Sequence, residues 1–314
     1  MSNVTVIVVS WNARDFVRAC LTSIAQAAGD MEAEVLVVDN ASSDGTPDMV
    51  EQDFPWVTLI RSQSNLGFAK ANNIAMRRAS GKYIFLINSD VTVPSGCMES
   101  MLKYMEAHRS VGILGPKMLT PNGSPGPSCM RRASLTLWLA QALGLTVFCK
   151  GLRIHLENFN CSETQDVDVL NGWFWMVRKE ALEQVGLLDE QFFMYGEDID
   201  WCRRFWKHGW KVVYFPEAAA VHYGGASSGR APLRFYIELH RARLKYWKRD
   251  HGYVSMLAYV CILWLHQSLR VLGYGSVYLL KRSRRDEALF KVKRSLACLL
   301  WLVGIRPRAE LAVN

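Results

Sequence analysis

Hydrophobic residues in the first half of the chain occur as short continuous runs that alternate with longer amphipathic segments. Residues 4–9, 34–38 and 83–87 are such runs, rich in Val, Ile and Leu, and runs of this length are typical of strands buried on both faces. Residues 13–27 and 66–79 instead place their apolar side chains at helical spacing. Because strands that alternate with helices build a mainly parallel sheet covered on both faces, the pattern predicts an α/β fold.

The pattern is less regular between these elements and residue 230. A turn at residues 42–46 precedes a helix with Pro47 in its first turn, where proline is favoured. Residues 116–127 are rich in Pro, Gly, Asn and Ser and predict a loop, and residues 128–165 predict no definite element. Further strands are expected at residues 57–60, 111–114, 167–177 and 211–215, and a further helix at residues 94–108.

The chain changes character beyond residue 230. Residues 234–249 predict a basic helix, and residues 254–280 are strongly apolar apart from His266, Gln267 and Arg270. This apolar stretch is long enough to cross a bilayer, but a charge near the centre of a spanning helix is costly. We therefore expect it to lie in the membrane interface or to re-enter it. A helix for dimerisation or core packing is the alternative.

Composition supports two folded parts and narrows the partners. Half of the 314 residues are hydrophobic and 21% are charged, which allows one domain at residues 1–230 and a basic, apolar region at residues 231–314. The net charge of +8 fits anionic lipid head groups, and no motif for binding nucleic acid accompanies it. The eight cysteines form no C-x-x-C pair, and the N-terminus does not predict a secretory signal.

Polar side chains follow three of the expected strands. The carboxyl ends of strands in an open α/β sheet border the ligand crevice, so these side chains are expected to share one site. Asp90 in that crevice could bind Mg²⁺, which takes oxygen ligands and commonly one or two carboxylates beside substrate phosphates. Taken alone, an aspartate there is better interpreted as a helix cap or turn residue; the other polar segments around it favour the metal site. The three groups are Ser10 with Asn12, Asp39 with Asn40, and Asn88-Ser89-Asp90.

Two further features suit a nucleotide diphosphate. Asp39 could accept hydrogen bonds from a base or a ribose, although Asp39 and Asn40 also suit an ordinary strand-to-helix loop. Gly67 lies near the start of the helix expected at residues 66–79, and Lys70 in that helix could face a diphosphate. The alternative for Lys70 is a solvated helix face.

The second half offers candidates for acceptor binding and proton transfer. Trp173 and Trp175 could form an aromatic platform for a sugar, although such residues more often lie in a core. Glu197 and Asp198 are adjacent acids, which can raise one another's pKa toward neutrality. One of them could therefore be a general base, and we favour Asp198.

Two charged positions remain. Asp200 stands three residues before Arg203, so an ion pair on one helix face is expected. His222 could complete a metal site begun by Asp90, because imidazole binds several divalent metals. A structural histidine is an equally good interpretation of His222.

Five segments together resemble the family 2 glycosyltransferases, which have the GT-A fold, a Rossmann-like and mainly parallel sheet with flanking helices. They stand in family order between residues 4 and 228. The second and third segments are similar in sequence to those of a bacterial branch of the family that uses dTDP-L-rhamnose and polyprenyl-diphosphate carriers. The segments are Val9-Ser10-Trp11-Asn12, Val38-Asp39-Asn40-Ala41-Ser42-Ser43-Asp44-Gly45-Thr46, Asn65-Leu66-Gly67-Phe68-Ala69-Lys70-Ala71-Asn72-Asn73, Asn88-Ser89-Asp90 and Gly196-Glu197-Asp198-Ile199-Asp200.

The resemblance implies an inverting transfer of L-rhamnose from dTDP-rhamnose to a hydroxyl of a polyprenyl-diphosphate-linked saccharide, as in the synthesis of cell-wall or surface polysaccharide. It implies Mg²⁺ or Mn²⁺ on the donor diphosphate, held by Asp90 with His222, and proton removal by Asp198, with Glu197 as the alternative. It further implies a peripheral protein at the cytoplasmic face of the inner membrane. The residues implied in nucleotide-sugar binding are Ser10, Asn12, Asp39, Asn40, Gly67, Lys70, Asn88, Ser89 and Asp90.

Two positions depart from the family pattern. Asn88 stands where the family commonly has the first acid of an Asp-x-Asp metal motif, which weakens the predicted metal site. Asn40 stands where many members carry a second Asp, which weakens recognition of UDP. A UDP-sugar-dependent transferase of the same fold and a non-catalytic nucleotide-sugar-binding module are the alternatives. A dinucleotide oxidoreductase is excluded because no Gly-x-Gly-x-x-Gly follows the first strand.

Overall fold

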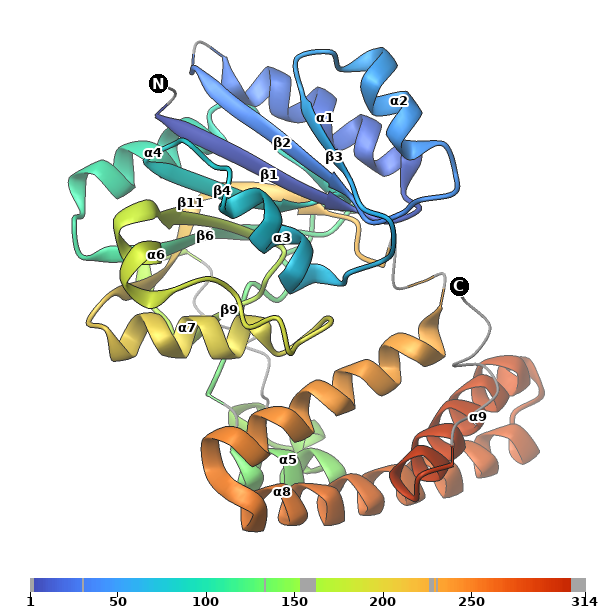
Figure 1. The fold of residues 1–314 in the computed structure, drawn as a ribbon. Coiled ribbons are helices and arrows are strands. Elements are labelled where there is room, and N and C mark those ends of the chain that lie inside the picture. The colour runs from blue at the N-terminus through green and yellow to red at the C-terminus, as the bar shows by residue number, and fades with distance from the viewer. Residues whose placement is uncertain are drawn as a thin grey trace. The chain divides into compact units, whose positions relative to one another are not determined.

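The computed structural model describes residues 3–29, 31–132, 134–152, 162–225, 229 and 231–305 (Figure 1). The chain divides into two compact units, one of Met1–Arg132 with His155–Arg230 and the other of Ala133–Ile154 with Ala231–Asn314. The second unit thus includes residues 133–154, which the sequence pattern did not separate from the first domain. Local patterns do not reveal such an association, because it joins segments far apart in the sequence.

The first unit is built on a nine-stranded mixed sheet whose strand order is β3-β2-β1-β4-β10-β6-β11-β5, with β8 paired to β11. Strands β1 to β4 are mutually parallel in the order β3-β2-β1-β4, as the alternating pattern predicts. Strand β10 runs antiparallel between β4 and β6, and β11 is parallel to β6. The bounds are β1 (Val4–Ser10), β2 (Ala33–Asp39), β3 (Thr58–Arg61), β4 (Tyr83–Asn88), β5 (Val91–Thr92), β6 (Val111–Leu119), β8 (Gln165–Asp166), β10 (Phe174–Arg178) and β11 (Lys211–His222).

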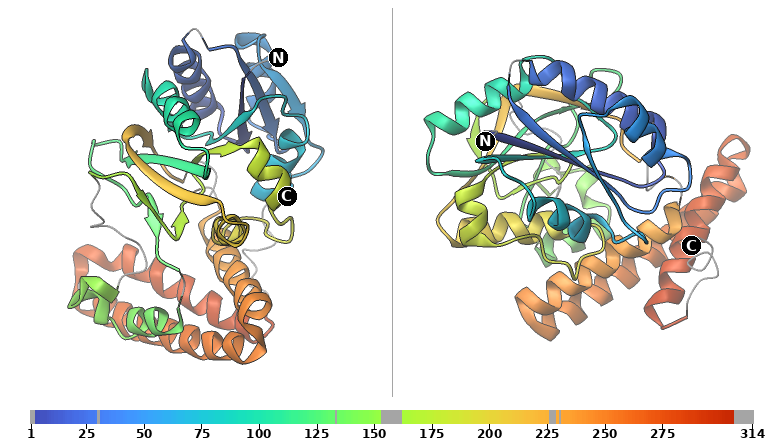
Figure 2. Two further views of the ribbon diagram at one scale, coloured as in Figure 1. Left: turned by 90° about the vertical axis from the view of Figure 1, so that its left-hand side faces the viewer. Right: turned by 45° about the horizontal axis from the view of Figure 1, so that its top comes forward.

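Helices cover both faces of this sheet, as Figure 2 shows. The side chains of Val6 and Val8 in β1 pack with α1, α2 and α4, whereas Ile7 packs on the opposite face with α3, α6 and α7. Burial on both faces explains why β1 is a continuous apolar run rather than an alternating one. The helices are α1 (Arg14–Ala28), α2 (Thr46–Asp53), α3 (Phe68–Met76), α4 (Cys97–Ala107), α6 (Lys179–Val185) and α7 (Glu197–Lys207).

Two strands are longer than the sequence pattern predicts. Strand β6 continues through Pro116, where a loop was expected, and β11 continues to His222 instead of ending at residue 215. The register between the two strands shifts after Phe215, where Pro216 follows. Proline within a sheet is tolerated at such irregularities, because a bulged residue needs no ladder hydrogen bond.

The strand expected at residues 167–177 is instead divided. It consists of β9 (Val169–Leu170) and β10, with a turn between them. Strand β9 pairs with β7 (Cys129–Met130) in a separate two-stranded sheet. Residues 153–161, part of the segment for which no element was predicted, lie outside the described residues.

The second unit is helical in its described part. The apolar stretch is continuous helix through His266, Gln267 and Arg270, and the break lies at Gly252, whose φ of 81° and ψ of 176° divide α8 into arms of residues 232–251 and 253–280. Glycine adopts such a backbone conformation without strain. The elements are α5 (Leu135–Ala142), the short 3₁₀ turns η1 (Leu145–Val147) and η2 (Lys150–Leu152), α8 (Pro232–Leu280), η4 (Arg282–Arg284) and α9 (Arg285–Leu302).

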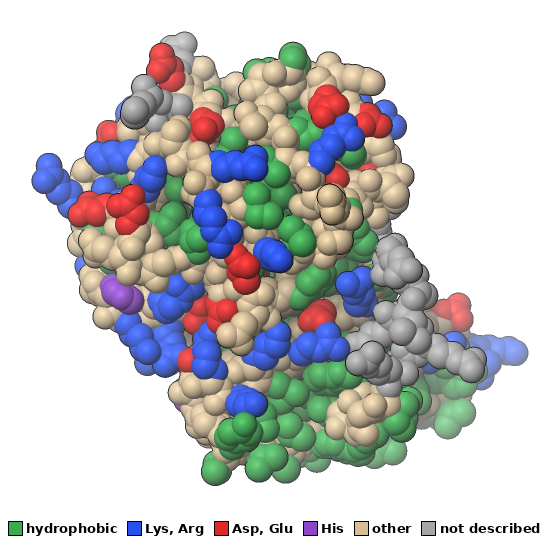
Figure 3. Space-filling model, in the orientation of Figure 1, with side chains coloured by type: hydrophobic (Ala, Val, Ile, Leu, Met, Phe, Trp, Pro, Cys, Tyr) green, Lys and Arg blue, Asp and Glu red, His purple; other side chains and the backbone are tan. Residues whose placement is uncertain are grey.

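Helix α8 is the one helix in the described ranges that is long and apolar enough to cross a membrane, and 17% of its apolar window is buried inside the structure. Val254, Leu272 and Leu280 of the second arm are 82%, 68% and 83% exposed. Figure 3 shows hydrophobic side chains gathered in the lower part of the view, where Figure 1 places this arm. A single soluble domain rarely leaves so large an apolar surface uncovered.

Candidate active site

The three polar groups predicted at strand ends meet at one edge of the sheet. The register pairs Ser10 with Asp39 across β1 and β2, and Val9 with Asn88 across β1 and β4. The strands are parallel, so their carboxyl ends face the same side. The expected crevice beyond the strand ends is therefore built from residues separated by up to 80 positions in the sequence.

Ser10 and Asp39 leave polar atoms unpaired at the carboxyl ends of β1 and β2. Both residues are buried, at 1% and 2% exposure. One Asp39 oxygen, Oδ2, accepts a hydrogen bond from the Ser42 amide at 2.9 Å, but Asp39 Oδ1 and the Ser10 hydroxyl have no partner. An unsatisfied buried polar atom destabilises a fold by about 1–3 kcal/mol. A ligand with hydrogen-bonding groups, such as a nucleoside, would remove that penalty.

Asn12 and Asn40 form hydrogen bonds that hold the loops beside these strand ends. Asn12 adopts a φ of 49°, and its Oδ1 accepts a hydrogen bond from the Ser43 amide at 2.7 Å. Asn40 donates from Nδ2 to the Gly67 carbonyl at 3.1 Å and accepts at Oδ1 from the Leu66 amide at 3.2 Å. The contribution of both side chains is therefore to fix the loops that border the site.

Gly67 and Lys70 stand at the start of α3. A Cβ atom on Gly67 would lie 2.2 Å from the Phe193 carbonyl oxygen, which accepts a hydrogen bond from the Phe68 amide at 2.7 Å. Glycine at this position thus permits close contact between two backbone segments. Lys70 is exposed in the first turn of α3, so its contact with a diphosphate stays a prediction.

The side chains of Asp90 and His222 are in direct contact. The Asp90 Oδ1 and His222 Nε2 atoms are 3.1 Å apart, and the two side chains are 8% and 17% exposed. Strand β5, directly after Asp90, pairs with the end of β11, and the Tyr223 amide donates to the Asp90 carbonyl at 3.0 Å. The Trp173 ring stacks on the imidazole at 5.6 Å with an interplanar angle of 17°, which orients His222 toward the carboxylate.

This pair fits a divalent cation that is also bound by substrate. Among the described residues no group of three or more His, Cys, Asp or Glu side chains is arranged to hold a metal. One carboxylate and one imidazole nevertheless suit Mn²⁺ or Mg²⁺ when substrate phosphates complete the coordination. Asn88 stands where an acid was expected, and its amide side chain adds no charge to the site. Its backbone amide donates to the Trp173 carbonyl at 2.9 Å. Ser89 beside it is 5% exposed.

Glu197 and Asp198 begin α7, which follows Gly196 in the left-handed conformation at a φ of 83°. Glu197 is 6% exposed, and its Oε2 has no hydrogen-bond partner. Burial, with a smaller contribution from Asp198, raises the pKa of Glu197 well above its ordinary value. Asp198 is half-buried, and its Oδ1 accepts from the Ile199 amide at 2.8 Å. Asp198 is thus the more accessible acid of the two.

Asp200 forms an ion pair with Arg204, at i,i+4 spacing on α7. The Asp200 Oδ2 atom accepts a hydrogen bond from Arg204 Nε at 2.9 Å. The Arg204 guanidinium also donates to the carbonyls of Val185 at 2.9 Å and Leu187 at 2.8 Å. The Arg204 guanidinium thus links Asp200 to the backbone around the end of α6, which is a structural role for Asp200.

The structure corrects the expected aromatic platform. Trp173 is 3% exposed and Trp175 is 0% exposed, so neither ring offers an open face to a sugar. Trp175 packs against Phe68 and Trp201, with ring centroids at 6.5 and 5.4 Å. Trp175 still lies near the acids, because a Cβ on Gly172 would be 3.1 Å from the Trp175 ring and 3.7 Å from the Asp198 Cβ.

The sequence pattern did not predict the unpaired polar atoms near Gly172. Asn171 donates from Nδ2 to the Pro127 carbonyl at 2.6 Å, but its Oδ1 is buried without a partner. The Trp175 indole nitrogen and Glu197 Oε2 are likewise buried and unpaired. The only sequence signal for Asn171 is its place in an Asn-Gly turn before an aromatic strand, which is a weak indication of function.

Comparisons with known proteins identify the family of this chain. The sequence model described as Glycosyl transferase family 2 matches residues 5–186, more than half of the chain. The chain belongs to this family. The N-acetylglucosaminyl-diphospho-decaprenol L-rhamnosyltransferase of Mycobacterium tuberculosis is 31% identical over 229 residues, which cover 68% of this chain and 74% of that protein. The dTDP-rhamnosyl transferase RfbF of Shigella flexneri is 26% identical over 260 residues, or 77% and 79% of the two chains.

Solved structures agree on the fold. The mannosyltransferase PcManGT of Pyrobaculum calidifontis, in complex with GDP-Man and Mn²⁺, matches with a TM-score of 0.54 at 19% identity, over 95% of this chain and 87% of that one. The TarS 1–349 fragment of S. aureus, in complex with UDP-GlcNAc, gives a TM-score of 0.54 at 19% identity, over 99% and 84%. These matches confirm the predicted GT-A fold. This family 2 glycosyltransferase is accordingly a hexosyltransferase, as its similarity to rhamnosyltransferases also indicates.

Proposed function

We propose that this family 2 glycosyltransferase transfers L-rhamnose from dTDP-L-rhamnose to a hydroxyl of a polyprenyl-diphosphate-linked saccharide, in the synthesis of cell-wall or surface polysaccharide. The observation that carries the proposal is the Asp90–His222 pair at 3.1 Å, beside the unpaired Ser10 and Asp39 atoms at the same strand ends. The choice of sugar and acceptor rests on the similarity to the mycobacterial and Shigella rhamnosyltransferases.

The donor would lie along the strand ends. Asp39 Oδ1 and the Ser10 hydroxyl would bind the nucleoside, since they are buried and unpaired. Asn12, Asn40 and Gly67 would hold the surrounding loops in place. Lys70 in the first turn of α3 would add a positive charge for the diphosphate, with Asn88 and Ser89 beside Asp90.

Asp90 and His222 would hold Mg²⁺ or Mn²⁺ together with the donor diphosphate. Such a cation stabilises the negative charge that develops on a leaving diphosphate. The imidazole would remain oriented by its stacking on Trp173. The absence of an acid at Asn88 leaves one carboxylate in the set, so a modest affinity that depends on bound donor is expected.

Asp198 would act as the general base. The acceptor oxygen forms a bond to the anomeric carbon while its proton passes to Asp198, and the bond from that carbon to the diphosphate oxygen breaks, with dTDP leaving. One displacement of this kind inverts the configuration at the anomeric carbon. The raised pKa of Glu197 favours its protonated form, so Asp198, the more accessible of the two acids, is the proposed base.

A lipid-linked acceptor requires the enzyme to work at a membrane surface. The exposed apolar side chains of the second arm of α8 and the adjoining basic residues 281–285 support peripheral binding to an anionic bilayer. We propose the cytoplasmic face of the inner membrane as the location, because nucleotide-sugars are made in the cytoplasm.

A panel of nucleotide-sugars tests this proposal. We expect dTDP-L-rhamnose to be turned over in the presence of Mn²⁺ or Mg²⁺, and UDP-glucose, UDP-GlcNAc and GDP-mannose to be turned over at least tenfold more slowly. Faster turnover of a UDP-sugar would support the UDP-dependent alternative. Tight binding of dTDP-rhamnose with no turnover on any lipid-linked acceptor would support a non-catalytic module.

A further inference from the structure

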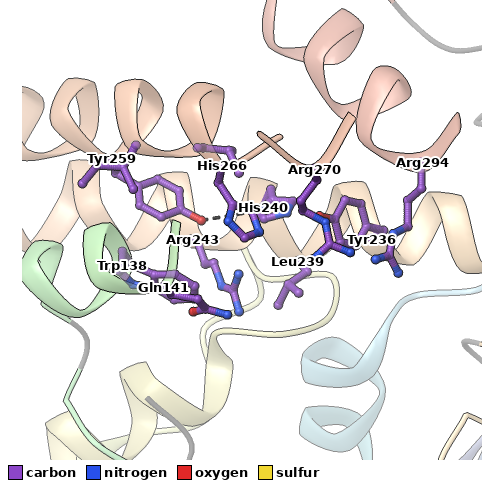
Figure 4. Close-up of a pocket in the computed structure, with 12 residues that line it drawn as sticks. Trp138, Gln141, Tyr236, Leu239, His240, Arg243, Tyr259, His266, Arg270 and Arg294 are labelled. Atoms are coloured by element: carbon purple, nitrogen blue, oxygen red, sulfur yellow. Dashed lines mark hydrogen bonds between the residues drawn. The ribbon is translucent and has the colours of Figure 1, made fainter. Parts of the chain in front are cut away.

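A cavity of about 180 Å³ lies within the second unit, between α5, the two arms of α8 and α9 (Figure 4). Its volume is several times the roughly 30 Å³ that one water molecule occupies in the liquid. None of its lining residues belongs to the candidate active site. The cavity therefore requires an explanation of its own.

The lining is positively charged. Arg243, Arg270 and Arg294 border the cavity together with His240 and His266, and its lining contains no Asp or Glu. Within the described ranges none of the three arginines forms an ion pair with a carboxylate. Uncompensated charge of one sign in a partly buried cavity is unfavourable, and an anionic ligand would offset it.

The arginines are held by aromatic rings rather than by acids. The Arg243 guanidinium lies 4.0 Å from the Trp138 ring centroid, and that of Arg294 lies 4.3 Å from the Tyr236 centroid. Stacking on a ring fixes the plane of a guanidinium but leaves its N–H groups at the edge available. Those edges match the oxygens of phosphate, which arginine binds through two parallel hydrogen bonds.

Buried donors around the cavity lack partners. His240 is 4% exposed; its Nδ1 lies 3.2 Å from the Tyr259 hydroxyl, and its Nε2 has no partner. The Nε atoms of Arg270 and Arg294 are also buried and unpaired. Figure 4 shows these side chains gathered around one space. Burial and the surrounding cations lower the pKa of His240 well below its ordinary value, which disfavours the charged form of this imidazole.

We propose that this cavity binds a phosphate group, either a terminal phosphate or a diphosphate, through Arg243, Arg270 and Arg294. The site lies in the second unit and does not depend on the proposed glycosyl transfer. The phosphate would belong to a lipid head group or to a soluble compound. Exposed apolar side chains on the same arm of α8, such as Leu269 and Leu272, are compatible with a ligand carried by a lipid.

Calorimetric titration of the full chain with pyrophosphate tests the site. EDTA is included so that metal-dependent binding at Asp90 does not contribute. We expect wild-type protein and the Asp90→Asn variant to bind alike, and Arg270→Gln and Arg294→Gln to bind at least tenfold more weakly. The exposed Arg282→Gln is the matched control and should bind like wild type. No binding by wild type, or equal binding by the cavity variants, would overturn the proposal.

Two further measurements complete the test. If either Gln variant fails to fold by circular dichroism, the corresponding Arg→Lys variants keep the charge but lose the paired hydrogen bonds, and they should still bind at least severalfold more weakly. Vesicles of phosphatidylcholine with or without phosphatidic acid identify the source of the phosphate. Loss of phosphatidic-acid-dependent binding in the cavity variants assigns it to a lipid, and loss of pyrophosphate binding alone assigns it to a soluble compound. Unchanged binding of both ligands would contradict the site.

Discussion

The Asp90 carboxylate and the His222 imidazole lie 3.1 Å apart although 132 positions separate them in the sequence. Their meeting depends on β11 extending to His222 and pairing with β5 directly after Asp90. The pair is the centre of the proposed chemistry, because in that proposal it would supply the protein's ligands for a cation on the donor diphosphate.

Replacing His222 with Gln should weaken metal binding while Asp90 remains. We expect the apparent affinity for Mn²⁺ to fall about 10–100-fold, an effect typical of disturbed metal sites, and turnover to recover at high Mn²⁺. The measurement is the initial rate as a function of Mn²⁺ concentration. His208→Gln, at an exposed histidine of α7's C-terminal cap, is the control. An unchanged Mn²⁺ dependence would remove His222 from the metal site.

Asp198→Asn should abolish most turnover without preventing donor binding. Loss of a general base reduces kcat roughly 10²–10⁴-fold, whereas the KM for dTDP-rhamnose should change little. Glu197→Gln should reduce kcat far less, since the raised pKa of Glu197 favours the protonated form, which cannot accept the acceptor's proton. If the two variants lost activity in the reverse order, Glu197 would be the base.

The raised pKa of Glu197 also predicts how stability depends on pH. The folded state holds a proton that the unfolded state releases above the ordinary pKa of 4.5. The free energy of unfolding should therefore fall as pH rises from that value to the raised pKa of Glu197. In Glu197→Gln this fall should be smaller. Urea unfolding at pH 5 and pH 8 measures it, and identical pH dependence in the variant and the wild type would contradict the assignment.

Gly67→Ala tests the contact between α3 and the loop before α7. Its φ is 81°, and the new Cβ would meet the Phe193 carbonyl at 2.2 Å. We expect a loss clearly greater than the about 1–3 kcal/mol that a sparsely populated backbone conformation alone would cost. Gly123→Ala is the matched control, because Gly123 has the same φ of 81° with nothing within 4 Å. Equal losses of unfolding free energy in the two variants would show that the close contact is unimportant.

Membrane association should depend on the second arm of α8. Replacing Val254, Leu272 and Leu280 with Ser should weaken binding to anionic vesicles at least roughly tenfold, since each apolar side chain that is buried contributes roughly 1.5–3 kcal/mol. These side chains are mostly exposed, so folding should persist. Trp56→Ser, at an exposed site of the first unit, is the control. Removal of residues 251–314 should likewise release the protein. Full vesicle binding by the triple variant would place the membrane contact elsewhere.

The sequence allowed the strands and the strand-end cluster to be predicted because β1, β2 and β4 are covered on both faces and so appear as continuous apolar runs. It did not reveal that β11 continues past Pro216 to carry His222 beside Asp90, since proline normally ends a strand. The burial of Trp173 and Trp175 could not be predicted either, because aromatic residues serve cores and sugar sites alike. The arginine-lined cavity could not be predicted from the sequence because its residues come from three helices. Helix α5 precedes the other two by 90 or more residues.

Turnover of dTDP-L-rhamnose by wild-type protein and by Asp90→Asn, each with Mn²⁺ and after removal of metal with EDTA, is the most direct test of the account. We predict that wild-type turnover requires the metal and returns when Mn²⁺ is restored. Asp90→Asn should be at least roughly 100-fold slower at the same Mn²⁺ concentration, because charge stabilisation by a bound cation contributes several kcal/mol. Full wild-type turnover in metal-free buffer, or an Asp90→Asn variant as active as wild type, would contradict it.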